Sequence, residues 1–352
     1  MRDPFRLGRT VHDEKSQPIH VRGQGAGAVS DPVAEAQTLA VRVEAEIGKQ
    51  LFGQADLVRN VVIALLSGGH CLVEGTPGLG KTLLVRTLGQ ALGIAFSRIQ
   101  FTPDLMPTDV IGTNVFSQAD DGSKSLRFET GPIFAGIVLA DEINRATPKT
   151  QSALLEAMEE GQVTVGNTTK RLPEPFFVLA TQNPLEMEGT YPLPEVQLDR
   201  FFFKIIVGYP SHDELRQIVR ATTARATVAV EQVATADQLL LARAVVRELP
   251  IASYVRDYAS RVILATQPTR DAPKIVRQFV NYGASPRGAQ TLVLAAKARA
   301  LLDQRYNVSF ADIRAVARPT LRHRIRRNLT GEVAGVSTEE LIEAILEHVI
   351  EE

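Results

Sequence analysis

The chain has 352 residues, 44% of them hydrophobic, which is enough for two domains with buried cores. Its net charge of −1 excludes a strong general attraction to nucleic acid or anionic membranes, and its single cysteine, Cys71, excludes an intramolecular disulfide and fits a reducing, cytoplasmic environment. No stretch approaches the roughly 20 apolar residues of a membrane-spanning helix, no apolar region near Met1 indicates a secretory signal, and the six histidines lack metal-ligand spacing.

The N-terminal residues 1–32 are polar and show no periodicity, so we expect a disordered tail, with a regulatory role as the alternative. Two helices are predicted next, one beginning at about Pro32 and one over residues 55–68. Leu51 and Phe52 lie between them, shortly before the first strand. Either side chain could pack against an adenine ring or in the protein core.

A glycine-rich turn between a strand and a helix is the strongest motif of the chain. The segment 70–82 reads HCLVEGTPGLGKT, an apolar run followed by the pattern G-x-x-x-x-G-K-[ST], and helical spacing continues to Gly93. This context predicts a P-loop, whose backbone N–H groups bind phosphate oxygens. We expect Lys81 to reach the β- and γ-phosphates of a nucleotide and the Thr82 hydroxyl to ligate Mg²⁺. The predicted nucleotide-binding residues of the loop are Gly75, Thr76, Pro77, Gly78, Leu79, Gly80, Lys81 and Thr82.

The next segments predict a strand and a hairpin. Residues 94–101, IAFSRIQF, alternate as a strand does. Residues 117–132 contain two short runs around Asp120-Asp121-Gly122, which is a turn signal. This connection is more elaborate than a plain passage from strand to helix.

A second chemical motif is the segment 136–146, GIVLADEINRA, in which an apolar strand ends at Asp141 and Glu142. A carboxylate at the end of a strand that faces a P-loop is suited to the magnesium shell, so Asp141 is the predicted ligand of Mg²⁺. Glu142 is placed to accept a proton from the attacking water. Since neighbours in a strand point to opposite faces, both reach one site only where the strand ends. A helix N-cap pair is the alternative.

A further buried strand is predicted to end at Thr181, Gln182 and Asn183, after a hairpin around Gly166-Asn167. A polar residue at this strand end would lie beside the γ-phosphate, so Asn183 could orient the lytic water. Alternatively, Asn183 caps the turn before Pro184.

Asp199 and Arg200 come directly before an apolar strand over residues 201–207. An exposed Arg200 could project from the subunit edge toward a neighbour's nucleotide, as an arginine finger does. A surface salt bridge with Asp199 is the alternative, and it would contribute little.

Helices dominate after residues 208–210, so we expect a domain boundary near Tyr209. The predicted capping boxes pair Ser211 with Glu214, Thr235 with Gln238 and Ser337 with Glu340.

One single arginine and one cluster of arginines stand out in these helices. Arg287 lies in the first turn of a helix, where a positive charge is unfavourable because it opposes the helix dipole. A role in binding a phosphate would explain this position, and the alternative is an exposed arginine without a function. A basic cluster late in the chain has no interleaved aromatics, so we expect a helix face toward a neighbouring subunit or solvent rather than a nucleic-acid stacking surface. Its members are Arg318, Arg322, Arg324, Arg326 and Arg327.

Together these motifs resemble the AAA+ ATPases and, within them, the MoxR family. The resemblance rests on GTPGLGKT, LADEINRA, ATQNP, LPEVQLDRF and GASPRGAQ, in this order, and spans the chain from about Val33. It implies an α/β core with a parallel five-stranded sheet over residues 33–209 and an all-helical lid over residues 210–352. It also implies that Asn183 is sensor 1, Arg200 the arginine finger and Arg287 sensor 2, which relatives place in cis or in trans. Residues 114–134 match the family's helix-2 insert and residues 162–175 its pre-sensor hairpin.

The resemblance implies Mg²⁺-dependent ATP hydrolysis by a homo-oligomer, a hexameric ring, and a chaperone-like role on a protein client. It further implies a partner with a von Willebrand factor A domain and, by analogy, metal-cofactor insertion. One alternative is a DNA-associated motor, since the same clade includes helicases, but the near-neutral charge weighs against a nucleic-acid partner. The other is a nucleotide-gated scaffold that does not hydrolyse ATP.

Overall fold

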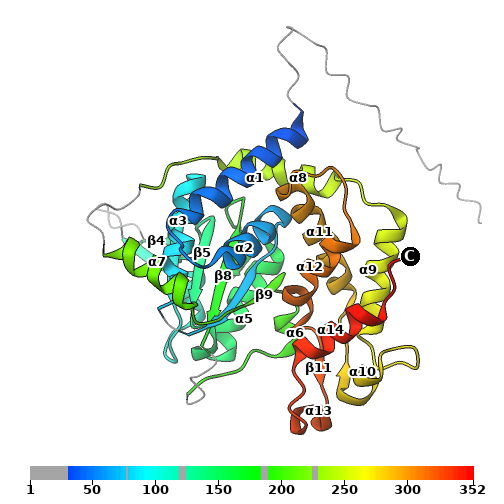
Figure 1. The fold of residues 1–352 in the computed structure, drawn as a ribbon. Coiled ribbons are helices and arrows are strands. Elements are labelled where there is room, and N and C mark those ends of the chain that lie inside the picture. The colour runs from blue at the N-terminus through cyan, green and yellow to red at the C-terminus, as the bar shows by residue number, and fades with distance from the viewer. Residues whose placement is uncertain (1–30, 77, 119–123, 184–188, 224–228) are drawn as a thin grey trace, which may run out of the picture. The chain divides into compact units, whose positions relative to one another are not determined.

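A five-stranded parallel sheet lies at the centre of the fold (Figure 1). The computed structural model describes residues 31–76, 78–118, 124–183, 189–223 and 229–352, so the predicted disordered tail lies outside the described residues up to residue 30. The strand order is β2-β5-β8-β1-β9, and each neighbouring pair is parallel, which confirms the predicted α/β sheet. The strands are β1 Cys71–Gly75, β2 Phe96–Gln100, β5 Ile137–Asp141, β8 Phe177–Gln182 and β9 Phe203–Val207.

Helices cover both faces of this sheet. Val73 and Leu139 belong to one hydrophobic core, while their chain neighbours Leu72 and Ala140 belong to a second one. Because successive strand residues point to opposite faces, a strand covered on both sides must be apolar throughout, as these runs are. The helices of the first core include α1 Pro32–Gly48, α2 Ala55–Ser67 and α3 Lys81–Leu92, and those of the second include α4 Pro107–Ile111 and α5 Pro148–Glu160.

Two antiparallel hairpins extend from the core. The predicted hairpin around Gly166-Asn167 is confirmed, with β6 Gln162–Val165 paired to β7 Thr168–Arg171. The second hairpin pairs β3 Gly112–Gln118 with β4 Lys124–Thr130, and its predicted turn Asp120-Asp121-Gly122 lies outside the described residues. The Lys170 ammonium lies 5.4 Å from the centroid of the Phe128 ring, so a cation–π contact joins the two hairpins.

The C-terminal third is helical, as predicted, and the three predicted capping boxes are present. A short antiparallel pair, β10 Val280–Tyr282 with β11 Arg326–Arg327, departs from the predicted all-helical lid, since strands of two or three residues show no sequence period. Residues on both sides of Tyr209 belong to one compact unit, Pro32–Glu352, so the domain boundary there stays a prediction. The remaining elements are η1 Ile143–Arg145, α6 Glu195–Leu198, α7 His212–Thr222, α8 Ala236–Glu248, α9 Ser253–Ala265, α10 Lys274–Phe279, α11 Pro286–Leu302, α12 Phe310–Leu321, α13 Leu329–Val333 and α14 Thr338–His348.

Arg324 corrects the prediction of an exposed basic helix face. This arginine is only 6% exposed, and its Nε donates to Asp199 Oδ1 at 2.8 Å. Its Nη1 and Nη2 donate to the backbone carbonyls of Phe202 and Phe201, directly before β9. A guanidinium has five N–H donors, so one buried arginine can satisfy several carbonyls at once. Arg324 therefore fastens the end of α12 to the sheet.

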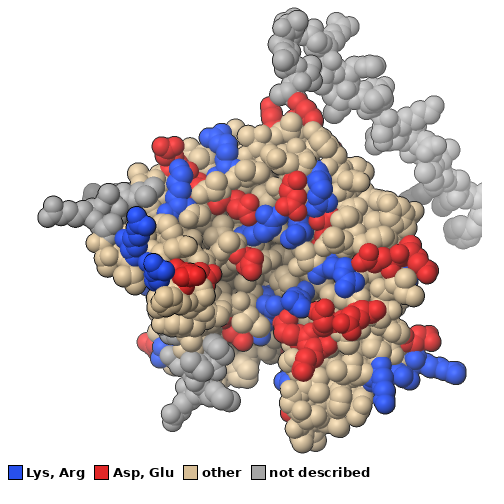
Figure 2. Space-filling view, in the orientation of Figure 1, with Lys and Arg blue, Asp and Glu red and all other residues tan. Residues whose placement is uncertain are grey.

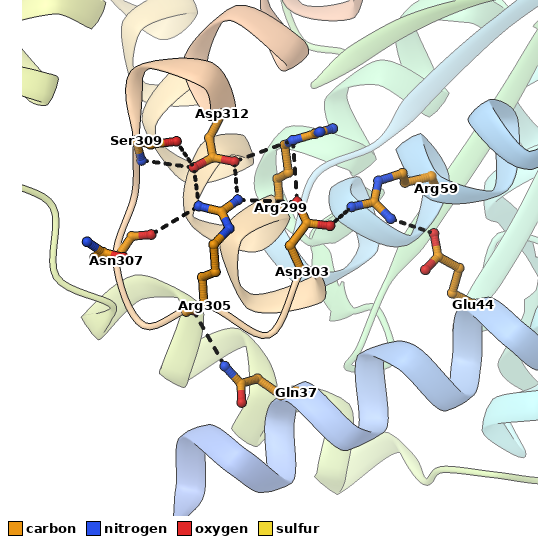
Figure 3. Close-up of polar contacts among 9 residues, drawn as sticks. All are labelled: Gln37, Glu44, Arg59, Arg299, Asp303, Arg305, Asn307, Ser309 and Asp312. Atoms are coloured by element: carbon orange, nitrogen blue, oxygen red, sulfur yellow. Dashed lines mark hydrogen bonds and ion pairs between the residues drawn. The ribbon is translucent and has the colours of Figure 1, made fainter.

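A polar network joins α1 and α2 to the helices α11 and α12 (Figure 3). At its centre Asp312, 1% exposed, accepts hydrogen bonds from Arg305, from the Ser309 backbone N–H and from the Ser309 hydroxyl. Burial acts to raise the pKa of Asp312, but the hydrogen bonds from Arg305 and Ser309 outweigh it, so the pKa lies below its ordinary value. The buried carboxylate is thus stabilised in its charged form.

Replacing Asp312 by alanine is expected to lower the free energy of unfolding by about 2–3 kcal/mol, because the hydrogen bonds of Arg305 and Ser309 to a buried carboxylate are lost. Asp257→Ala is the control, since Asp257 is 68% exposed and its pair with Arg261 is worth about 0–1 kcal/mol. Because the folded-state pKa of Asp312 is depressed, its contribution is present above the unfolded value of 3.8 and is lost as the pH falls below it. Urea unfolding at pH 7 and pH 3 checks this, and the loss of unfolding free energy in Asp312→Ala should be smaller at pH 3 than at pH 7. If Asp312→Ala and Asp257→Ala lose the same free energy of unfolding at pH 7, the expected role of Asp312 is contradicted.

Candidate functional site

The carboxyl ends of four parallel strands meet around a pocket of about 460 Å³. Open α/β sheets bind ligands at this edge of the sheet. Thr76 follows β1 in the same loop, and Pro77 lies outside the described residues. The pocket brings together these predicted site residues: Gly75, Gly78, Leu79, Gly80, Lys81, Thr82, Asp141, Glu142 and Asn183.

The glycine loop has the backbone conformation of an anion site. Gly78 and Gly80 have φ angles of 86° and 74°, in the left-handed region that side chains other than glycine rarely adopt. Gly80 is the N-cap of α3, so the loop passes directly into the N-terminus of a twelve-residue helix. Unpaired N–H groups and the helix dipole favour negative charge at such a terminus. The loop can therefore hold phosphate oxygens.

Lys81 lies in the first turn of α3 and reaches back across the loop. Its Nζ donates to the Gly75 carbonyl oxygen at 2.6 Å. Burial lowers the pKa of Lys81 below its ordinary value, while the carboxylates of Asp141, Glu142 and Glu74 act in the opposite direction. The ammonium group thus lies among carboxylates at the place where a triphosphate would meet the loop.

Asp141 and Glu142 both line the pocket because the backbone turns sharply where β5 ends. Glu142 has φ 57°, a left-handed conformation that costs of the order of 1–3 kcal/mol in a residue other than glycine. Its backbone N–H donates to Thr181 Oγ1 at 2.9 Å, and Thr181 Oγ1 donates to Asp141 Oδ1 at 2.6 Å. Glu142 is the N-cap of η1 but makes no side-chain capping bond, so its carboxylate is directed to other partners.

Three polar side chains that were not among the predicted site residues hold these carboxylates. Arg98 Nη2 donates to Asp141 Oδ2 at 2.6 Å, and Gln100 Nε2 donates to Glu142 Oε2 at 2.9 Å. Arg145 Nη1 also donates to Glu142 Oε2 at 2.9 Å. Gln100 pairs with Asp141 in the parallel register, so the alternation of β2 puts Arg98 and Gln100 on the face of the site. In the sequence, the spacing of Arg98 and Gln100 two positions apart in a strand could have indicated that both face the site.

Of the other residues predicted near the nucleotide, Asn183 lines the pocket, whereas Leu51 and Phe52 do not. Asn183 is 7% exposed and follows β8 into the pocket. Leu51 belongs to the hydrophobic core, which favours packing over contact with adenine, and the described lining of the pocket includes neither Leu51 nor Phe52. Gln54 Nε2 instead donates to the Leu79 carbonyl at 2.9 Å and braces the loop.

Arg200 and Arg287 lie together in a different pocket, of about 320 Å³. Both contact Glu159 at the end of α5, with Arg200 Nε 3.1 Å from Glu159 Oε2. The alternative that Arg200 pairs with Asp199 is wrong, because Asp199 accepts hydrogen bonds from Arg324 and Ser285. Among the described residues, the two pockets share no lining residue. The structure therefore gathers the predicted site residues into two sets rather than one.

Magnesium fits the residues present in the first pocket. Mg²⁺ usually takes one or two protein oxygens together with substrate phosphates and waters, and Thr82 and Asp141 supply such oxygens here. Among the described residues no group of three or more histidine, cysteine or acidic side chains could hold a metal by itself. No helix in the described part of the chain is both long and apolar enough to cross a membrane.

Comparisons with known proteins agree with this geometry. Residues 70–203 match the ATPase family associated with various cellular activities (AAA), and residues 272–345 match the AAA lid domain. Chaperone MoxR1 of Mycobacterium tuberculosis is 43% identical over 92% of this chain and 85% of its own length. Protein MoxR of Methylorubrum extorquens is 34% identical over 81% of this chain and 87% of its own.

Among solved structures, a candidate ATPase from Cytophaga hutchinsonii is 40% identical, with a TM-score of 0.84 over 91% of this chain and 96% of that chain. Its fold and the two family matches show a nucleotide-binding AAA core followed by an AAA lid. The chain therefore belongs to the MoxR family of AAA+ ATPases, and its reaction is the hydrolysis of ATP.

Proposed function

We propose that the chain hydrolyses Mg²⁺–ATP as a homo-oligomeric ring of six protomers, in which Arg200 and Arg287 of one protomer complete the ATP site of its neighbour. The observation that supports this most strongly is the separation of the two pockets, since Arg200 and Arg287 do not line the pocket that contains the glycine loop. Cationic groups held away from a protomer's own ATP site can stabilise the transition state of an adjacent one. The same separation favours sensor 2 acting in trans.

Within one protomer, each role follows from placement in the pocket. The glycine loop and Lys81 hold the β- and γ-phosphates, while Thr82 and Asp141 hold Mg²⁺. The metal ion, when bound, neutralises negative charge on the phosphate oxygens. Glu142 accepts the proton of the attacking water, and Asn183 orients that water.

The energy of hydrolysis serves chaperone-like remodelling of a protein client in this proposal. A 43% identical relative is named a chaperone, and the hairpin β3–β4 offers an apolar contact surface. Phe116 and Leu126 are cross-strand partners that are 83% and 59% exposed. Exposed apolar side chains that lie side by side can contribute to a surface for protein contact. A partner with a von Willebrand factor A domain, metal-cofactor insertion and a cytoplasmic location extend the proposal by analogy alone.

The DNA-associated alternative finds less support. A surface that binds phosphodiester backbones concentrates lysine and arginine on one face. On the face drawn in Figure 2, basic and acidic side chains are interspersed, and the net charge is −1. These observations favour a protein client over nucleic acid.

The test is ATP turnover measured against protein concentration and free Mg²⁺, with sedimentation velocity on the same samples. We expect turnover per protomer to rise with concentration in step with oligomer formation, because each site needs a neighbour's arginines. Removal of Mg²⁺ by EDTA should abolish turnover. Constant turnover per protomer in samples that sediment as monomers would contradict the proposed shared site.

A further inference from the structure

Glu159 joins two arginines that are far apart in the sequence. It lies at the end of α5, and its Oε2 is 3.1 Å from Arg200 Nε. Its Oε1 accepts a hydrogen bond from Arg287 Nη2. Arg200 lies in the loop between α6 and β9, whereas Arg287 lies in the first turn of α11. One carboxylate thus links a residue next to the sheet with a residue of the C-terminal helices.

The carboxylate of Glu159 reduces the repulsion between the two guanidinium groups. Two guanidinium groups directed to one site repel each other, and each long side chain loses rotamer freedom when it is fixed. A carboxylate between them neutralises one of the two charges and orders both side chains before a ligand arrives. The side chain of Glu159 is 32% exposed, and those of Arg200 and Arg287 are 26% and 49% exposed, so all three can still meet a partner.

Glu159 is the carboxylate available for this task. Among the described residues that line the second pocket, the acidic side chains are Glu159 and Asp199. Asp199 is already engaged, since its carboxylate accepts from Arg324 Nε at 2.8 Å and from Ser285 Oγ at 2.9 Å. Glu159 does not line the ATP pocket and lies near the C-terminal end of α5, the helix that follows Glu142 and η1.

We propose that Glu159 is a positioning residue that holds Arg200 and Arg287 as one pair, so that both guanidinium groups meet the neighbouring protomer's ATP in a fixed geometry. The proposal rests on the proposed function, because it assumes that these arginines act on an adjacent site. Small misplacements of groups that meet a reacting phosphate have large effects on rate. Glu159 itself touches neither the nucleotide nor the reacting atoms.

The test uses Glu159→Gln in the full-length protein, with Glu160→Gln as the matched control on the same exposed helix end. We expect kcat to fall about tenfold, while KM for ATP changes by less than about twofold, because the glycine loop is intact. Without nucleotide, amide hydrogen exchange in the first turn of α11 should become faster than in the parent. A kcat within about twofold of the parent would overturn the proposal.

A combined variant separates positioning from a general structural role. In a background that carries both Arg200→Ala and Arg287→Ala, Glu159→Gln should lower kcat by less than about twofold, because both of its partners are already gone. A second full tenfold loss would overturn the proposal. If Glu159→Gln does not fold, Glu159→Asp keeps the charge but withdraws the carboxylate by one methylene, and an intermediate loss of kcat is expected.

The proposal and the proposed function can fail separately. If Arg200→Ala lowers kcat but Glu159→Gln does not, the arginines act without Glu159 and the proposed function stands. If neither change lowers kcat, the shared site itself is contradicted.

Discussion

Glu142→Gln is expected to lower the rate of ATP hydrolysis by about 10²–10⁴-fold while ATP binding is retained, because the amide cannot accept the proton of the attacking water. The glycine loop, Lys81 and Asp141 remain in place, so the affinity for ATP should stay close to that of the parent. Hydrolysis is measured by phosphate release, and binding by equilibrium titration with a fluorescent ATP analogue. The variant should also retain ATP-dependent partners long enough to recover a client by affinity purification.

The control is Glu156→Gln, a charge-neutralising change at an exposed position of α5. It should leave both hydrolysis and binding unchanged. Unchanged hydrolysis in Glu142→Gln would favour the scaffold that does not depend on turnover. Loss of binding together with hydrolysis would instead show that the hydrogen bonds of Glu142 to Gln100 and Arg145 serve to hold the pocket together.

Arg200→Ala is expected to lower kcat by about 10³-fold, since an arginine supplied in trans stabilises the charge that develops on the transferred phosphoryl group. The variant should bind ATP through its own glycine loop, which lies in the other pocket. Arg200→Lys should recover only part of the rate, because an ammonium group lacks the planar fork of the guanidinium. Steady-state phosphate release at saturating Mg²⁺–ATP checks both variants.

Arg277→Ala serves as the control, because Arg277 is an exposed arginine of α10. Sedimentation velocity must show that the Arg200 variants assemble as the parent does. A kcat close to that of the parent in an assembled Arg200→Ala sample would contradict the arginine-finger role.

The sequence was most informative where a motif and its chemistry lie close together in the chain. The pattern from Gly75 to Thr82 specifies a strand, a tight turn and a helix, and the structure has all three in that order. The apolar strands were recognisable because helices cover both faces of a parallel sheet. The capping box of Ser337 with Glu340 also depends only on residues three positions apart.

Contacts between distant segments were not predictable in the same way. Arg98 and Gln100 meet the carboxylates of Asp141 and Glu142 only because β2 lies beside β5 in the sheet. Arg324 looked like one member of an exposed basic cluster, yet a single buried guanidinium satisfies carbonyls before β9. Such partners depend on strand order and helix packing, which no local pattern records.

The separation of the candidate site into two pockets joins one prediction and one open point. The motif around Arg200 predicted contact with a neighbour's nucleotide, whereas the motif around Arg287 left open whether that residue acts in cis or in trans. The structure places Lys81 in the first pocket and Arg200 with Arg287 at Glu159 in the second. A single chain therefore carries two half-sites, and joining them requires a second copy of the chain in our proposal.

Mixing two inactive variants tests this central claim most directly. Lys81→Ala removes the phosphate-binding ammonium group but keeps Arg200, whereas Arg200→Ala keeps the glycine loop, so each variant alone should be nearly inactive. In an equal, randomly assembled mixture, about a quarter of the interfaces combine an intact loop with an intact arginine, so turnover should recover toward about a quarter of the parent's rate. A mixture that assembles into rings and stays as inactive as its two components would show that Arg200 does not act on a neighbour's ATP.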